Sequence, residues 1–192
     1  MIPFSNPLIG LAMDNYPEDL APEFEDGGAV KTPFDIWWLR AQASFPNVPE
    51  NVAREWLHRH WKHSPYCYLI SKNYTFELKQ WETLKNIRTR WSDLNADNAG
   101  ALRKGKELME LRPEWMPWVP RYMLEHRKFP APIIVLDNRN GHHNEEYSAE
   151  VKLPLAYVLI EGHTRFNTGI YMESIGQLDR ADAWLMKKNL AC

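Results

Sequence analysis

Residues 157–167 read YVLIEGHTRFN, an apolar run that ends at a carboxylate and Gly162 and is followed by residues that open a helix. A glycine at such a junction can adopt a left-handed or close-approach backbone conformation, and the residues after it present amide N–H groups at the positive end of a helix dipole. His163, Thr164 and Arg165 add side-chain donors beside those amides. The junction is therefore a candidate phosphate-binding turn.

A second apolar run lies upstream of this junction. Residues 133–136 read IIVL, a β-branched stretch suited to a buried strand, and Asn140-Gly141 favours a turn shortly after it. The chain is expected to return through residues 150–153 and to continue as the strand at 157–160. Helices are expected at 121–128, 164–175 and 179–190.

The first 113 residues have a different character. Residues 1–31 are rich in proline, glycine and acidic side chains without a sustained period, which predicts an irregular arm. The patterns farther along predict helices at 33–44, 49–63, 82–91 and 99–111 and short strands at 66–70 and 74–78. We therefore expect an α+β chain, with a mainly helical region at 1–113 packed on a small mixed-sheet α/β domain at 114–192.

The order of helix, apolar strand, returning strand and helix-opening turn, together with the EGHTRFN motif, resembles the ParB/sulfiredoxin superfamily. Members of this superfamily carry Asp-Gly-His-His-Arg, Gly-Glu-Arg-Arg or Gly-Cys-His-Arg after an apolar strand. The resemblance covers residues 116–175. It implies a compact α/β domain that binds a nucleoside triphosphate through this turn and the start of the following helix.

The resemblance assigns roles by position in the motif. Glu161 matches the acidic residue, Gly162 the glycine, His163 the first histidine and Arg165 the final arginine. Thr164 departs from the pattern, because a hydroxyl replaces a histidine or an arginine there. The resemblance thus implies phosphate binding by residues 162–165, with one cation fewer than in the family.

Sulfiredoxin activity is disfavoured. That reaction needs a thiolate directly after the motif glycine, because the nucleophile attacks a phosphoryl-activated sulfinate. His163 occupies this position, and the two cysteines, Cys67 and Cys192, lie outside the motif.

The other members of the superfamily imply nucleotide hydrolysis, DNA cleavage or both, and one plasmid-borne branch combines nuclease and ATP-hydrolysing activity. Phosphoryl transfer needs cations on the phosphates, a carboxylate for Mg²⁺ or water, and a backbone cradle. The resemblance implies Glu161 and His163 as catalytic residues. Asp137 is expected as a second carboxylate, because neighbouring strand ends lie close together. Glu161 and Asp137 would then bind Mg²⁺, with ATP or another nucleoside triphosphate as the ligand.

Each of these residues also has a structural interpretation. Glu161 and Arg165 could form a simple ion pair, Thr164 could be an N-cap, and His163 could be satisfied by backbone groups. Two histidine-rich stretches, residues 58–67 and 142–146, contain metal-ligand types. Their spacing places the side chains on different faces, so a helix surface and a solvated turn are the favoured interpretations.

The expected partners are a nucleotide, DNA or a partner protein. The net charge of −2 excludes none of them. A groove for DNA could be lined by basic side chains with Trp38 or Trp91 as stacking surfaces, although a solvated surface is favoured for each basic residue. These residues are Arg54, Arg59, Lys62, Arg88, Arg90, Arg103, Lys104 and Lys106.

The chain carries no secretory pattern and no apolar run of membrane-spanning length, so we expect a cytoplasmic protein without a membrane partner. The alternative to an enzyme of plasmid, phage or defence biology is a non-catalytic interaction protein. Such a protein would use the same fold to bind a partner protein or DNA and inhibit it.

Overall fold

The computed structural model of the chain describes residues 17–66, 69, 74–90, 98–143 and 152–189. The chain divides into two compact units, unit 1 with Met1–Thr75 and Asn189–Cys192, and unit 2 with Phe76–Lys188. The division falls at residue 75, whereas the sequence placed it after residue 113. The reason is that strand β2 (Ile87–Arg88) and helix α3 (Ala99–Met109) belong to unit 2. There β2 pairs with strand β4 (Tyr157–Glu161), and α3 packs on helix α6 (His163–Ser174).

Unit 1 contains α1 (Phe34–Ala41) and α2 (Glu50–Val52), which continues as a π-helical segment at Ala53–His58. Both helices were expected from the sequence. Their core is aromatic: the rings of Trp37 and Trp61 meet edge to face at 5.8 Å, and the indole N–H of Trp37 donates to the Leu20 carbonyl at 2.7 Å. Edge-to-face contacts and a satisfied indole N–H are how tryptophans become fully buried.

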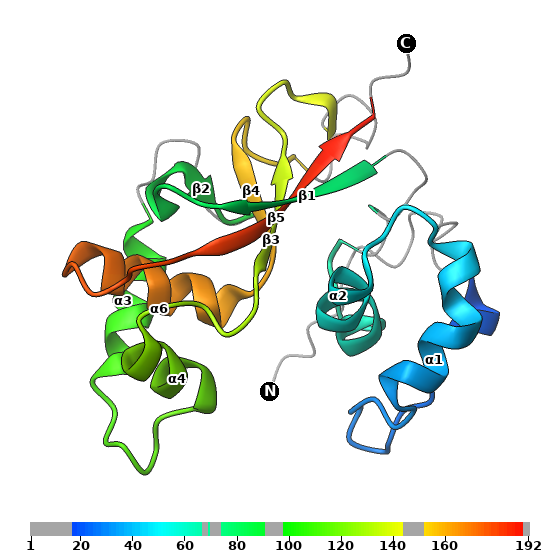
Figure 1. Cartoon of the computed structure of the whole chain (residues 1–192), viewed down its shortest axis with the longest axis horizontal. Coiled ribbons are helices and arrows are strands. Elements are labelled where there is room, and N and C mark those ends of the chain that lie inside the picture. The colour runs from blue at the N-terminus through cyan, green and yellow to red at the C-terminus, as the bar shows by residue number, and fades with distance from the viewer. Residues whose placement is uncertain (1–16, 67–68, 70–73, 91–97, 144–151, 190–192) are drawn as a thin grey trace, which may run out of the picture. The chain divides into compact units, whose positions relative to one another are not determined.

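The strands that the structure describes form one mixed sheet in the order β1-β5-β3-β4-β2 (Figure 1). Strand β3 pairs antiparallel with β4 and parallel with β5, and β2 runs parallel to β4. This agrees with the expected α+β class. The bounds of the other strands are β1 Tyr74–Gln80, β3 Ile133–Asp137, β4 Tyr157–Glu161 and β5 Asp182–Lys188.

Helices α3, α4 (Trp118–His126) and α6 (His163–Ser174) lie on one side of the sheet (Figure 1). The core beneath α6 joins Val135 of β3 and Leu159 of β4 to Phe166 and Ile170 of the helix. Helix α3 crosses α6 at backbone contact, since a Cβ added at Gly105 would lie 1.9 Å from the carbonyl oxygen of Asn167. The start of α6 is thus fixed by sheet and helix together.

Two expected helices are wrong. Residues 179–190 were expected to be helical, but Asp182–Lys188 form β5, which pairs with β3 along Ile133 to Leu136. Residues 82–91 were expected to be helical, but they contain a 3₁₀ turn at Leu84–Asn86 followed by β2. Alanine, leucine and lysine favour helices locally, and pairing with an open strand edge overrides that preference.

Most of the remaining expectations fall on described residues. The strands at 74–78, 133–136 and 157–160 and the helices at 99–111, 121–128 and 164–175 are confirmed, with shifts of a few residues at their ends. Lys152 and Leu153 are not in a strand, and neither are Tyr66 and Leu69 of the expected strand at 66–70. Residues 67–68, 70 and 150–151 lie outside the described ranges. No helix in the described part of the chain is long and apolar enough to cross a membrane.

Candidate functional site

The junction between β4 and α6 is built around Gly162. Its backbone is left-handed, with φ 98° and ψ 31°, as the sequence predicted. A Cβ at this position would lie 2.6 Å from Cγ2 of Ile133 and 3.1 Å from Nε of Arg165. Both the backbone angle and the close approach of β3 therefore require glycine.

Two polar side chains are exposed at the start of α6. His163 and Thr164 occupy the first two helical positions after the buried glycine, and Glu161 is half-buried at the end of β4. The amide of Phe166 donates to the Gly162 carbonyl at 2.8 Å, which begins the helical hydrogen-bond ladder. An imidazole and a hydroxyl thus stand at the positive end of the α6 dipole, where anions are stabilised.

Arg165, unlike His163 and Thr164, is buried. Its side chain is only 6% exposed, and Nη1 donates to the carbonyl oxygen of Ala131 at 3.3 Å. The guanidinium passes beside Gly162 and ties α6 to the segment that leads into β3. The arginine that the resemblance assigned to phosphate binding is therefore mostly buried and hydrogen-bonded to the backbone of the protein.

Asp137 lies at the opposite end of the strand pair from Glu161. In the antiparallel register Asp137 is opposite Tyr157, whereas Glu161 is opposite Ile134. Four residues of strand separate Tyr157 from Glu161, which corresponds to about 13 Å. Asp137 and Glu161 were expected to lie close together because each ends a strand. Strands β3 and β4 are antiparallel, so their carboxyl ends lie at opposite ends of the pair.

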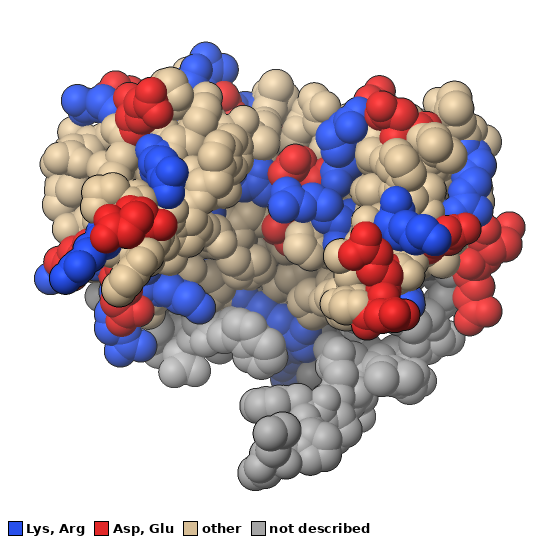
Figure 2. Space-filling view, turned by 90° about the horizontal axis from the view of Figure 1, so that it is seen from below, with Lys and Arg blue, Asp and Glu red and all other residues tan. Residues whose placement is uncertain are grey.

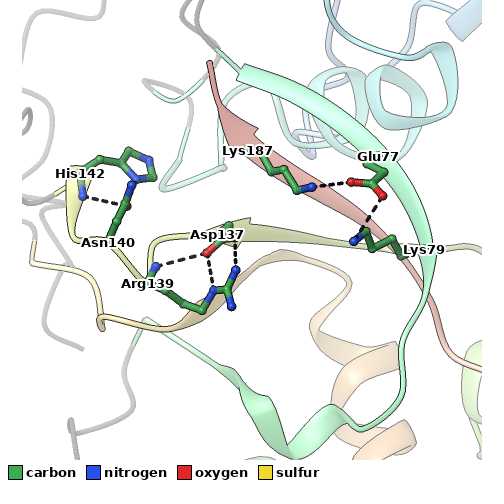
Figure 3. A network of polar contacts seen from close by, with 7 residues as sticks. All are labelled: Glu77, Lys79, Asp137, Arg139, Asn140, His142 and Lys187. Carbon is green, nitrogen blue, oxygen red and sulfur yellow. Dashed lines mark hydrogen bonds and ion pairs between the residues drawn. The ribbon is translucent and has the colours of Figure 1, made fainter. Parts of the chain in front are cut away.

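Asp137 is also occupied by an arginine. Nε and Nη2 of Arg139 donate to its two carboxylate oxygens, each at 2.8 Å (Figure 3). These hydrogen bonds hold the pKa of Asp137 below its usual value, and the charge of Lys187 acts in the same direction. The guanidinium carbon of Arg139 lies 4.3 Å from the ring centroid of Tyr157. Sequence reasoning missed Arg139, although an arginine two residues after a strand-ending aspartate was a usable signal.

A second ion-pair group lies on β1 and β5. Nζ of Lys187 is 2.5 Å from Oε2 of Glu77, and Nζ of Lys79 is 3.3 Å from Oε1 of the same glutamate (Figure 3). Both lysines lower the pKa of Glu77, with the hydrogen bond from Lys187 first. The charges around the carboxyl end of β3 are therefore paired with one another, which is the arrangement of a structural surface network.

The histidines after β3 are buried, so the favoured solvated turn is wrong for them. Nδ1 of His142 and Oδ1 of Asn140 lie 2.6 Å apart (Figure 3). The amide of His143 donates to Oδ1 of Asn138 at 3.1 Å. The Asn138 amide in turn donates to the Pro154 carbonyl at 2.9 Å. Asparagine side chains close this turn, and Glu145 and Glu146 of the proposed cluster lie outside the described residues.

Metal-type side chains do not gather elsewhere in the described ranges, where no group of three or more His, Cys, Asp or Glu could hold an ion. In unit 1 the buried His58 has Nε2 at 2.8 Å from the Thr32 carbonyl. A carbonyl can only accept, so Nε2 donates to it. Cys67 falls outside the described residues.

Several basic residues expected to line a DNA groove are matched by acids. Arg54 pairs with Asp35 and Glu50, and Arg59, Arg103 and Lys106 each pair with a glutamate four residues away. On the face drawn in Figure 2, basic and acidic side chains are interspersed. These ion pairs support a solvated surface for the four basic residues. The expected stacking residue Trp91 lies outside the described ranges.

Comparison of the chain with protein-family models, with curated proteins and with solved structures found no match.

Proposed function

We propose that this chain binds the phosphate groups of a nucleotide at the β4–α6 junction. The observation that carries the proposal is the left-handed Gly162 between β4 and α6, with exposed His163 and Thr164 at the start of the helix. The left-handed glycine turns the chain from the strand directly into the helix, and the positive end of the helix dipole favours a negatively charged ligand. The resemblance to the ParB/sulfiredoxin superfamily implies the same ligand class.

Hydrolysis of the bound nucleotide is the second part of the proposal, and it involves fewer residues than the sequence suggested. Glu161 and His163 flank the glycine and would orient water and accept its proton. Asp137 does not fit a shared Mg²⁺ site with Glu161, because it lies at the other end of the β3–β4 pair and is held by Arg139. Of the two predicted Mg²⁺ ligands, Glu161 and Asp137, only Glu161 would then bind an ion that accompanies the triphosphate.

Calorimetric titration with ATP, GTP and CTP tests the binding step, and phosphate release in the presence of Mg²⁺ tests hydrolysis. Thr164→Asp places a negative charge at the binding turn while suiting a helix start. We expect it to weaken binding at least tenfold, with Thr164→Asn as the matched neutral control. Absence of binding for every triphosphate, or equal affinity in the aspartate variant, would rule out this site.

A non-catalytic binding protein is the second candidate function, and the separation of Asp137 from Glu161 favours it. The two candidates differ in one measurement. A chain that binds a triphosphate without releasing phosphate, and whose affinity is unchanged in Glu161→Gln, is a binding protein. Release that falls in Glu161→Gln while affinity is kept supports a hydrolase.

A further inference from the structure

Two tryptophans at the start of α4 are largely exposed. Trp115 is 69% exposed and Trp118 is 64% exposed, whereas Trp37 and Trp56 are fully buried in unit 1. Large exposed aromatic side chains mark binding surfaces, because burying them in a complex lowers the free energy. The loop between α3 and α4 projects away from the sheet (Figure 1).

Trp118 begins a row of rings along α4. The ring centroids of Trp118 and Tyr122 lie 5.5 Å apart, and those of Tyr122 and His126 lie 4.2 Å apart. The three residues are spaced by four, so they share one face of the helix. Pro120 and Met123 are buried on the side of α4 that packs on the core. The row is therefore held in place by a fixed helix.

Basic side chains accompany these rings. The guanidinium carbon of Arg112 lies 5.6 Å from the ring centroid of Trp115. Nη2 of Arg121 donates to the carbonyls of Pro113 and Met116, each at 2.9 Å, and so fixes the loop between α3 and α4. Residues 112–128 contain four Lys or Arg against two Glu, and one of the four, Arg127, pairs with Asp179 at 3.0 Å. The other three cations, Arg112, Arg121 and Lys128, leave a small excess of positive charge over the two glutamates, which favours an anionic partner.

We propose that Trp115 and the ring row Trp118, Tyr122 and His126 form a stacking surface for single-stranded nucleic acid. Bases of a single strand expose their π faces and stack on aromatic rings, and nearby guanidinium groups attract the phosphates. A duplex keeps its bases paired and stacked, so its base faces cannot reach these rings. This surface is separate from the β4–α6 junction and does not depend on the function proposed there.

Fluorescence anisotropy of a labelled oligothymidine tests the proposal on the full chain. We expect binding at low salt, and a loss of roughly 5- to 100-fold in affinity for Trp118→Ala or Trp115→Ala. Trp118→Phe keeps a ring and should retain most of the affinity. Leu155→Ala is the matched control, since Leu155 is 62% exposed and lies on the segment before β4. Arg112→Gln should reduce the salt slope by about one phosphate contact.

Three results would overturn the proposal. The first is no binding of oligothymidine by the unmodified chain at low salt. The second is equal affinity for Trp118→Ala and the unmodified chain, with circular dichroism showing that both are folded. The third is displacement of the oligonucleotide by inorganic polyphosphate at equal phosphate concentration, because polyphosphate offers charge without bases.

Discussion

At one end of the β3–β4 strand pair Asp137 is held by Arg139, whereas at the other end Glu161 precedes Gly162 and the exposed start of α6. The first end consists of side chains that neutralise one another on the surface. The second consists of a backbone turn that only glycine can make, with polar side chains facing solvent. Conformational constraint and exposure together, rather than the number of charged residues, distinguish a candidate binding site from a structural network.

The largest effect is expected from Gly162→Ala. The alanine would have to keep the positive φ of Gly162, and its Cβ would lie 2.6 Å from Cγ2 of Ile133. We therefore expect a loss of about 3 kcal/mol or more in the free energy of unfolding. Gly176→Ala is the control, because Gly176 also has positive φ but no atom within 4 Å of its Cβ position. That change should cost about 1–2 kcal/mol. Equal losses in urea unfolding would show that the approach of β3 is unimportant.

Arg165→Met tests whether the buried arginine is a packing residue. Removing the guanidinium leaves the Ala131 carbonyl without this donor, and we expect a loss of about 1–3 kcal/mol. Arg103→Met is the comparison, because Arg103 is mostly exposed and makes one surface ion pair, and its loss should be about 0.5 kcal/mol or less. Unchanged stability of Arg165→Met together with lost nucleotide binding would restore the ligand role.

Asp137→Asn tests the closed end of the strand pair. We expect a loss of about 0.5–1 kcal/mol at neutral pH, since Arg139 is largely exposed and the ion pair is screened. The pKa of Asp137 is lowered by folding, so its stabilisation is present above the unfolded pKa of about 3.9 and is lost as pH falls through the folded value. The variant and the unmodified chain should thus converge in stability in acid, and nucleotide affinity should not change.

The smallest effect on stability is expected from Thr164→Asp. A carboxylate in the first turn of α6 interacts favourably with the helix dipole, which should raise the free energy of unfolding by about 0.3–1 kcal/mol. Thermal unfolding beside Thr164→Asn measures this gain at low salt. A gain in stability combined with a loss of nucleotide affinity would separate the helix-dipole effect from ligand binding at one position. A loss of stability would contradict the assignment of Thr164 to the first turn.

Much of the architecture followed from local patterns. The apolar runs at 133–136 and 157–160 became β3 and β4, and the glycine between strand and helix adopted the expected left-handed angle. Strand β5 did not follow, because Ala183, Leu185 and Met186 suit a helix equally well until a neighbouring strand edge is available. For the candidate site, the turn was predictable and the partners of its charged residues were not.

The sequence by itself determined where the chain turns at Gly162, because the backbone angles open to a glycine are a local property. Only the tertiary structure decided that Asp137 and Glu161 lie at opposite ends of a strand pair and that Arg165 is buried against Ala131. Strand direction and side-chain partners depend on contacts between residues far apart in the chain. The free energy of those contacts is set by burial and pairing in the folded unit, which no short stretch of sequence contains.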